Sequence, residues 1–167
     1  TLSYLPLPDP CAADIIPKFR SRTELSVFEK IEKSPHRLGA LVDSLGSNNR
    51  IFYKITGVGH WFTFTLSPPK FWRDGTEGSS TRENSVAFRT KPLRDNAFCS
   101  LCSTLHYWIY QARTNCRDFN PSDLAYLPIP PDLAAGVPVF GALATRIMEC
   151  LEETSSTGSG SYEVGGT

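Results

Sequence analysis

The spacing of apolar residues changes near the middle of the chain, and this change constrains the fold most. Residues 50–66 hold two runs rich in aromatic and β-branched residues, RIFYKIT and HWFTFTL, on either side of a GVG triplet. Such runs around a short glycine turn predict a β-hairpin. Residues 96–112 instead repeat apolar side chains every three or four positions, which predicts one helix. A chain with both periods in series is expected to adopt an α+β fold.

The remaining elements extend this expectation. The segment at about 85–91, SVAFRTK, reads as a third strand, and residues 67–84 read as a long loop rich in proline, glycine and charge. We therefore expect a small mixed or antiparallel sheet, made of the hairpin at about 50–66 and this strand, packed with helices. One helix is predicted to start at an N-cap on Thr23, and the last helix is predicted at about 138–153.

Domain boundaries follow from composition. We expect an N-terminal helical segment over 1–49, a core over 50–155 and a Gly/Ser-rich tail over 156–167. The chain does not begin with methionine, and we expect it to be one structural domain of a larger protein. Two short segments are nearly identical, YLPLPDP at 4–10 and YLPIPPD at 126–132. Their prolines predict an extended backbone in both.

The cysteine content and the hydropathy bear on the compartment. The chain has five cysteines, an odd number at scattered positions, which predicts free thiols in a reducing cytoplasm rather than a disulfide framework. No run of about 18 apolar residues occurs, so no membrane span is expected. The first residues, TLSYLPLPDP, lack the basic start and apolar stretch of a signal peptide.

Charge is unevenly distributed although the net charge is zero. Residues 50–117 carry ten Lys and Arg against four Asp and Glu, whereas residues 118–167 carry one Arg against seven acids. A basic middle of this kind is typical of a surface that binds a polyanion. The alternative is that the two oppositely charged parts fold against each other.

Three potential metal ligands fall on one predicted helix. Cys99, Cys102 and His106 lie three and four residues apart and face similar directions on a helix. Zinc requires four ligands, so Cys116 or Cys11 would have to supply the fourth. The competing interpretation is that the cysteines pack in the core as small apolar residues. The chain shows no paired carboxylates, catalytic triad or phosphate-binding loop, so we expect no catalysis by this chain alone.

The segment LCSTLHYWIYQARTNCRDFNPSDLAYLPIP resembles the closing motif of target recognition domains in adenine-specific DNA methyltransferases. The most similar are type IIG-like restriction–modification enzymes. Their motif has a helix of the form leucine-asparagine-serine-x-leucine-phenylalanine-tyrosine-tryptophan, then R-x-L-N, an acidic-capped turn and F-P-I-P. The matching residues are Leu101, Ser103, Leu105, Tyr107, Trp108, Arg117, Phe119, Asn120, Asp123, Leu124 and 127–130. The chain departs from the pattern at Cys102, where asparagine is common, and at His106, where phenylalanine is common.

The resemblance implies sequence-specific recognition of double-stranded DNA without catalysis. The NPPY-type motif and the glycine-rich S-adenosylmethionine motif of these enzymes do not occur in the 167 residues. No cofactor is therefore expected in this chain. S-adenosylmethionine is implied for the methyltransferase domain of the same parent chain, which is an implied partner, as is a nuclease domain.

The basic middle supplies the predicted DNA contacts. Lysines and arginines would bind phosphates, and side chains of the hairpin and of the 67–84 loop would read bases in the major groove. Trp61 and Trp72 could stack on bases. The predicted contact residues are Arg50, Lys54, His60, Arg73, Arg82, Asn84, Arg89 and Lys91. Two other functions stay open: a protein-interaction or assembly module that docks through LPLP and LPIPP, and a small zinc-stabilised domain.

Overall fold

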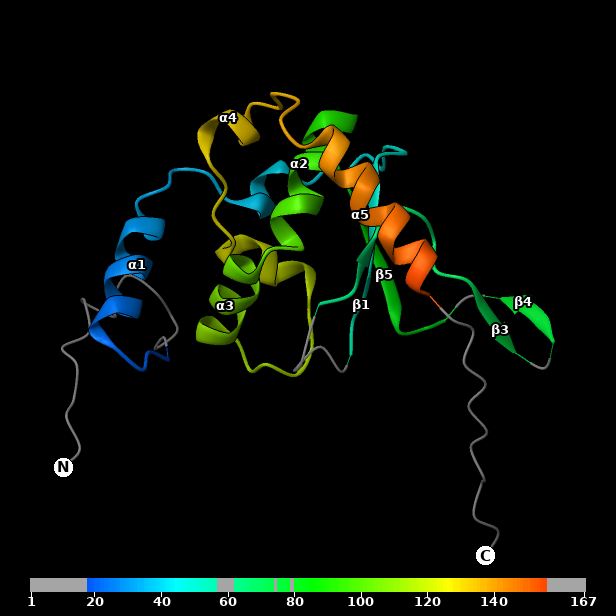
Figure 1. The fold of residues 1–167 in the computed structure, drawn as a ribbon, viewed down its shortest axis with the longest axis horizontal. Coiled ribbons are helices and arrows are strands. Elements are labelled where there is room, and N and C mark those ends of the chain that lie inside the picture. Colours follow the sequence, from blue (N-terminus) through cyan, green and yellow to red (C-terminus); the bar gives the residue numbers. More distant parts are fainter. Residues whose placement is uncertain (1–17, 57–61, 74, 79, 156–167) are drawn as a thin grey trace, which may run out of the picture.

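A computed structural model describes residues 18–56, 62–73, 75–78 and 80–155 (Figure 1). The fold is α+β, with small antiparallel sheets packed against helices, as expected from the sequence. The elements in chain order are α1 (Arg22–Glu32), η2 (Leu38–Leu41), β1 (Arg50–Lys54), β2 (Phe64–Thr65), β3 (Phe71–Arg73), β4 (Thr76–Gly78), β5 (Glu83–Ala87), α2 (Lys91–Leu101), α3 (Thr104–Arg113), η3 (Pro121–Tyr126), α4 (Pro131–Ala134) and α5 (Gly141–Thr154). Within this described part, no helix is long and apolar enough to cross a membrane.

The main sheet has three strands in the order β2-β1-β5, and both pairings are antiparallel. The predicted hairpin and third strand are therefore confirmed, although β2 has only two residues and the GVG turn lies outside the described residues. The third strand ends at Ala87 rather than at residue 91. The reason is that Thr90 caps α2 by accepting a hydrogen bond from the Leu93 backbone N–H.

The prediction of an unbroken loop over 67–84 is wrong. Strands β3 and β4 form a two-stranded ribbon in this segment, with Trp72 opposite Glu77 in the register. Gly75 has a φ of +77° between the two strands, a conformation that favours glycine. The ribbon projects to one side of the molecule, away from α1 and α3 (Figure 1).

The prediction of one helix over 96–112 is also wrong. The chain forms two helices, α2 and α3, separated by Cys102 and Ser103. Ser103 has an extended backbone, and its hydroxyl accepts a hydrogen bond from the backbone N–H of His106, which starts a new helix. The two cysteines therefore belong to the end of α2, whereas His106 belongs to α3.

Other helix ends differ less from the sequence prediction. Helix α1 is capped by Ser21 rather than by Thr23, because the Ser21 hydroxyl accepts the Glu24 backbone N–H. The last helix begins at Gly141, three residues later than expected. The NPSD segment starts η3 with Asn120 as the N-cap, and the carboxylate of Asp123 accepts the backbone N–H of Asn120 at 2.7 Å.

An aromatic cluster fills the space between the sheet and α3. The ring of Phe62 lies edge-on to Phe64, Tyr107, Tyr110 and Phe119, with ring centroids 4.9–5.1 Å apart. Edge-to-face pairs of this kind contribute about 0.5–1.5 kcal/mol each beyond the area they bury. This cluster fixes the distance between the end of the sheet and the residues that follow α3.

The N-terminal part of the described chain shares this core. Leu38 is fully buried, and its backbone N–H donates to the Leu127 carbonyl at 2.9 Å. Gly39 lies so close to η3 that an added Cβ would come within 3.1 Å of the Ala125 backbone nitrogen. Arg113 joins α3 to α1, since its guanidinium lies 3.1 Å from the Glu32 carboxylate. Part of the N-terminal segment predicted over 1–49 therefore packs against the predicted core.

Candidate nucleic-acid interface

Six of the eight predicted DNA-contact residues lie at the two ends of the β1–β5 pair. Lys54 pairs with Glu83 in the register and Tyr53 with Asn84, so Lys54, Arg82 and Asn84 lie at the same end of the pair, where β1 ends and β5 begins, with Lys54 and Asn84 on opposite faces of the sheet. We call these three residues, with the 114–120 loop beside them, the loop end. At the other end, Arg50 pairs with Ala87, close to where α2 begins.

The group at this second position, Arg50, Arg89 and Lys91, is called the helix end. Two of its cations are bound within the fold. Lys91 Nζ lies 2.8 Å from the Asp95 carboxylate, and Arg50 Nη1 donates to the Ser85 hydroxyl at 3.0 Å. Asp95 is buried, so the positive charge of Lys91 offsets the cost of placing a carboxylate in the core.

The cations of the loop end are more exposed. The side chains of Lys54 and Arg82 face solvent, and within the described part of the chain neither forms an ion pair. The backbone holds this region together, because Ile55 donates to the Arg82 carbonyl and accepts from the Phe119 N–H, both at 2.8 Å. The strand end is therefore flanked by Arg82 on one side and by the 114–120 loop on the other.

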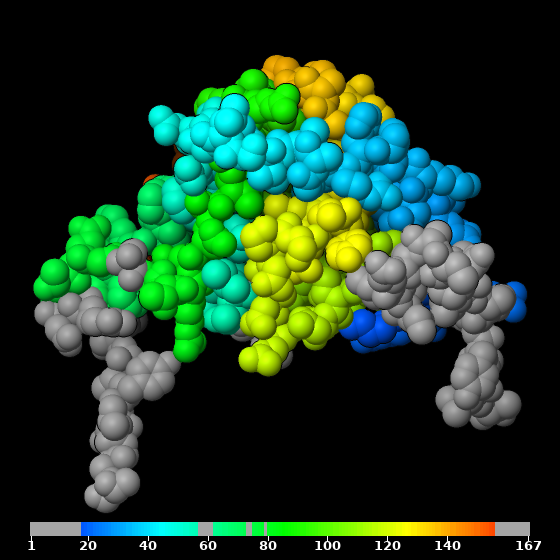
Figure 2. Space-filling view, turned by 180° about the vertical axis from the view of Figure 1, so that it is seen from behind, coloured from blue at the N-terminus to red at the C-terminus, as the bar shows by residue number. Residues whose placement is uncertain are grey.

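The 114–120 loop adds polar residues that the site prediction did not include. Arg117 has 83% of its side chain exposed, with Nε 3.4 Å from the Asp118 carboxylate. Asn115 and Asn120 are also exposed. In the space-filling view from behind (Figure 2), the yellow-green atoms of this loop border those of the sheet. The only sequence signal for this loop was the resemblance, in which Arg117 and Asn120 match the motif.

The buried residues of the same loop explain its shape. Phe119 is 1% exposed and packs edge-on against Tyr53, with ring centroids 5.2 Å apart. The hydroxyl of Tyr110 donates to the Asp118 carbonyl at 2.9 Å. These contacts fix the backbone that follows Arg117, whose own side chain faces solvent.

Acidic residues limit the positive potential of the loop end. Glu83 pairs with Lys54 across the strands, and Asp118 lies beside Arg117. Burial raises the pKa of Asp123, while its bond from the Asn120 backbone N–H acts in the opposite direction. The loop end therefore offers individual, directed cations rather than a broad positive field.

Asn84 is exposed on β5, within the loop end. An asparagine reads adenine by donating from its amide to N7 and accepting the N6 proton at its oxygen. Its Oδ1 already accepts the Ser85 backbone N–H at 2.8 Å, and the oxygen has a second lone pair. The amide nitrogen and this lone pair are the groups that Asn84 can present to a base.

The other predicted contacts lie elsewhere. Arg73 belongs to β3 at the turn end of the ribbon, and its side chain is outside the described part. Trp72 and Lys70 are exposed on the same ribbon segment. His60 and Trp61 lie outside the described residues, in the connection that follows the loop end of β1.

The three potential metal ligands, Cys99, Cys102 and His106, are held by contacts within the fold. His106 is buried, with Nε2 2.9 Å from the Pro128 carbonyl and Nδ1 3.1 Å from the Ser103 hydroxyl. Burial lowers the pKa of His106 to about 4 and raises the pKa of Cys99 to about 11 and that of Cys102 to about 12. Across the described ranges, no three His, Cys, Asp or Glu side chains gather to hold a metal ion.

These features are the basis for inferring a function. The chain matches no protein-family model, no curated protein and no solved structure.

Proposed function

We propose that this chain recognises a specific sequence in double-stranded DNA as the specificity domain of a DNA methyltransferase or restriction–modification enzyme, and that it has no catalytic activity of its own. One observation carries the proposal: the motif that resembles such domains is divided between core and surface. Phe119, Leu124 and Leu127 are buried. Arg117 is exposed in the 114–120 loop, which is joined to the end of β1 by the hydrogen bond from the Phe119 N–H to the Ile55 carbonyl.

In this proposal the loop end provides two kinds of contact. Lys54, Arg82 and Arg117 bind phosphates, which sets the position of the domain on the duplex. Asn84 presents an amide to a base edge. The β3–β4 ribbon, which comes shortly before Arg82 in the chain, would provide further contacts, since a two-stranded ribbon fits in the major groove.

The reaction belongs to a partner domain. The methyltransferase domain of the parent chain would bind S-adenosylmethionine and extrude the target base, and a nuclease domain would be present in the combined enzymes. The recognition domain itself holds no cofactor in this proposal. The proposal also implies the cytoplasm, where bacterial restriction–modification enzymes meet DNA.

A second candidate function is an interaction module, but it cannot dock through LPIPP as predicted, because Leu127 and Ile129 are buried in the fold; a different surface supports it. A groove between α1 and α3 exposes Val27 and Leu105 and is lined by Trp108. Such apolar grooves serve as docking sites for peptides, so the chain could act as an interaction module. This function predicts no salt-dependent affinity for DNA.

Selection from a randomised duplex library tests the primary proposal. The coding sequence before Thr1 is read first, and the longest protein containing this chain is used. We expect one enriched sequence, and we expect binding to weaken steeply with salt. Single-stranded DNA of the enriched sequence is the control and should compete poorly. A protein that contains the chain and a methyltransferase motif but enriches no sequence would overturn the proposal.

A further inference from the structure

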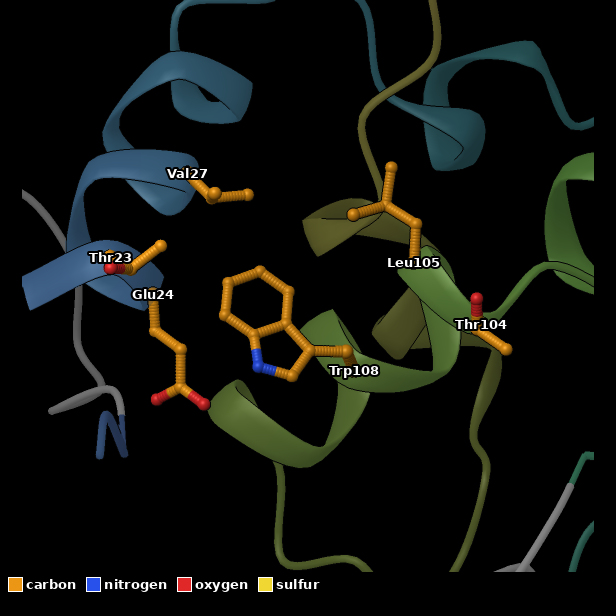
Figure 3. A pocket seen from close by; sticks show the side chains of 6 residues that line it. All are labelled: Thr23, Glu24, Val27, Thr104, Leu105 and Trp108. Atoms are coloured by element: carbon orange, nitrogen blue, oxygen red, sulfur yellow. The ribbon is translucent and has the colours of Figure 1, made fainter. Parts of the chain in front are cut away.

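We propose that residues 4–8, YLPLP, bind as an extended segment in the groove between α1 and α3 of the same chain. The groove has a volume of about 380 Å³. Thr23, Glu24 and Val27 line it from α1, and Thr104, Leu105 and Trp108 line it from α3 (Figure 3). This proposal does not rest on DNA recognition.

The groove leaves apolar side chains exposed between α1 and α3, two helices that are joined by the ion pair of Glu32 with Arg113. Val27 is 37% exposed and Leu105 is 44% exposed, whereas Phe28, next to Val27, is buried. In Figure 3, Val27 and the Trp108 ring face the space between the two helices. An apolar segment placed there would cover Val27, Leu105 and Trp108 together.

The chain enters the described structure next to this groove. The ring of Phe19 lies 4.8 Å from the ring of Phe28 and 6.4 Å from that of Trp108, between centroids. The backbone N–H of Lys18 donates to the Ala112 carbonyl at 2.9 Å, which fixes this point on α3. Trp108 thus contacts the entering chain and also lines the groove.

The length of the connection permits the proposed contact. Ten residue steps separate Pro8 from Lys18, and an extended chain of this length spans about 35 Å. A tethered segment is present at an effective concentration in the millimolar range, so even a weak site would be occupied. Proline also reduces the entropy that the segment loses on binding.

The second copy of this sequence shows how it packs on α3. In residues 126–130, YLPIP, Leu127 and Ile129 are buried and the Pro128 carbonyl accepts from His106 of α3. The backbone of the segment is extended and bonded to residues 36–38. Leu5 and Leu7 are two residues apart, as are Leu127 and Ile129. Leu105, which lines the groove, directly precedes His106 on α3. The groove therefore presents a neighbouring side of α3 to a nearly identical sequence.

Photo-crosslinking in the full chain tests this proposal. p-Benzoylphenylalanine replaces Leu105, and mass spectrometry identifies the residues that are joined after irradiation. We expect crosslinks to residues 4–8 within one chain. Leu143 on α5 is 46% exposed and provides a matched control position, from which crosslinks to residues 4–8 should be absent. Crosslinks from position 105 to another part of the chain, or between two chains, would overturn the proposal.

A second test keeps the crosslinker at position 105 and changes residues 4–8 instead. The double substitution Leu5→Ser with Leu7→Ser removes both apolar side chains from the proposed occupant. The crosslink yield to residues 4–8 should fall at least about tenfold, because serine does not replace the apolar surface that leucine buries in the groove. The control Leu2→Ser should keep the yield. An unchanged yield in the double variant would show that Leu5 and Leu7 are not held in the groove.

Discussion

The two ends of the β1–β5 pair hold similar numbers of predicted cations but use them differently. At the helix end, Lys91 is bound to the buried carboxylate of Asp95, and Arg50 donates to the hydroxyl of Ser85. At the loop end, Lys54 and Arg82 are exposed, and among the described residues they form no ion pair. Arg50 and Lys91 therefore form contacts within the fold, whereas Arg89 of the helix end and both cations of the loop end face solvent.

This difference suggests that the exposed residues of the loop end bind a ligand. A surface lysine is usually solvated and needs no explanation. Here, however, the backbone positions of Lys54, Arg82 and Arg117 are fixed by hydrogen bonds from Ile55 and by the burial of Phe119. The loop end thus carries charged side chains on a backbone that hydrogen bonds and core packing hold in place, and specific binding requires such an arrangement.

Removing the support of the loop end should produce the largest effect. We expect Phe119→Ala to lower the free energy of unfolding by about 3–5 kcal/mol, because the ring is buried among aromatic residues and its removal leaves a cavity. Urea denaturation measures the change. The control Leu45→Ala lies at a highly exposed position and should change stability by less than about 0.5 kcal/mol. Equal effects in both variants would show that Phe119 does not support the loop.

The burial of His106, in the same motif as Phe119, should make the stability of the fold depend on pH. Its pKa is about 4 in the folded protein and 6.5 in the unfolded chain, so the unfolded state binds the proton first as pH falls. Stability should therefore decrease between about pH 6.5 and pH 4, by up to about 3 kcal/mol. Urea midpoints across this range measure it. The variant His106→Gln should flatten this part of the profile, and a profile as steep as that of the native chain would contradict the assignment.

Paired asparagine substitutions compare the two ends in DNA reading. Asn84→Ser at the loop end should cost about 1–3 kcal/mol in discrimination at one base pair, because the amide can no longer bind adenine bidentately. Binding to a panel of single-base variants of the enriched duplex measures the change. Asn49→Ser near the helix end is the matched control and should leave the base preference unchanged. The reverse result would assign base reading to the helix end.

The smallest expected effects concern stability alone. Lys91→Met should destabilise the fold by about 0.5–1 kcal/mol, since Asp95 keeps Arg94 at 2.6 Å and the lysine is largely exposed. Lys54→Met should change stability by less than about 0.5 kcal/mol. Thermal unfolding at low and high salt compares the two variants. A larger destabilisation by Lys54→Met would mean that the loop-end cation is also structural.

The sequence predicted elements whose signals are local. The aromatic runs of 50–66 predicted the hairpin, which β1 and β2 form. The break between α2 and α3 was missed, because apolar residues keep their helical spacing across Cys102 and Ser103, although the helix itself is interrupted there. The hydroxyl of Ser103 was the available signal, since serine is a preferred N-cap. The β3–β4 ribbon was missed because its strands have only three residues each.

The grouping of the site could not be predicted from sequence. Lys54, Arg82 and Asn84 come together only through the register of β1 with β5, and Arg117 joins them through the bond between Phe119 and Ile55. Charge counts along the chain cannot distinguish these cations from Lys91, which is held by Asp95. The sequence therefore provided the candidate residues, and the tertiary contacts separated them into two groups.

The central claim is that the loop end, not the helix end, binds DNA, and paired triple variants test it most directly. One protein carries Lys54→Ser, Arg82→Ser and Arg117→Ser; the other carries the serine substitutions of Arg50, Arg89 and Lys91. Duplex binding is measured across a range of salt concentrations. The account predicts that the slope of log affinity against log salt falls in magnitude by about 0.9 for each phosphate that the first protein no longer neutralises, and is unchanged in the second protein. An unchanged slope in the loop-end variant, or a decrease confined to the helix-end variant, would contradict it.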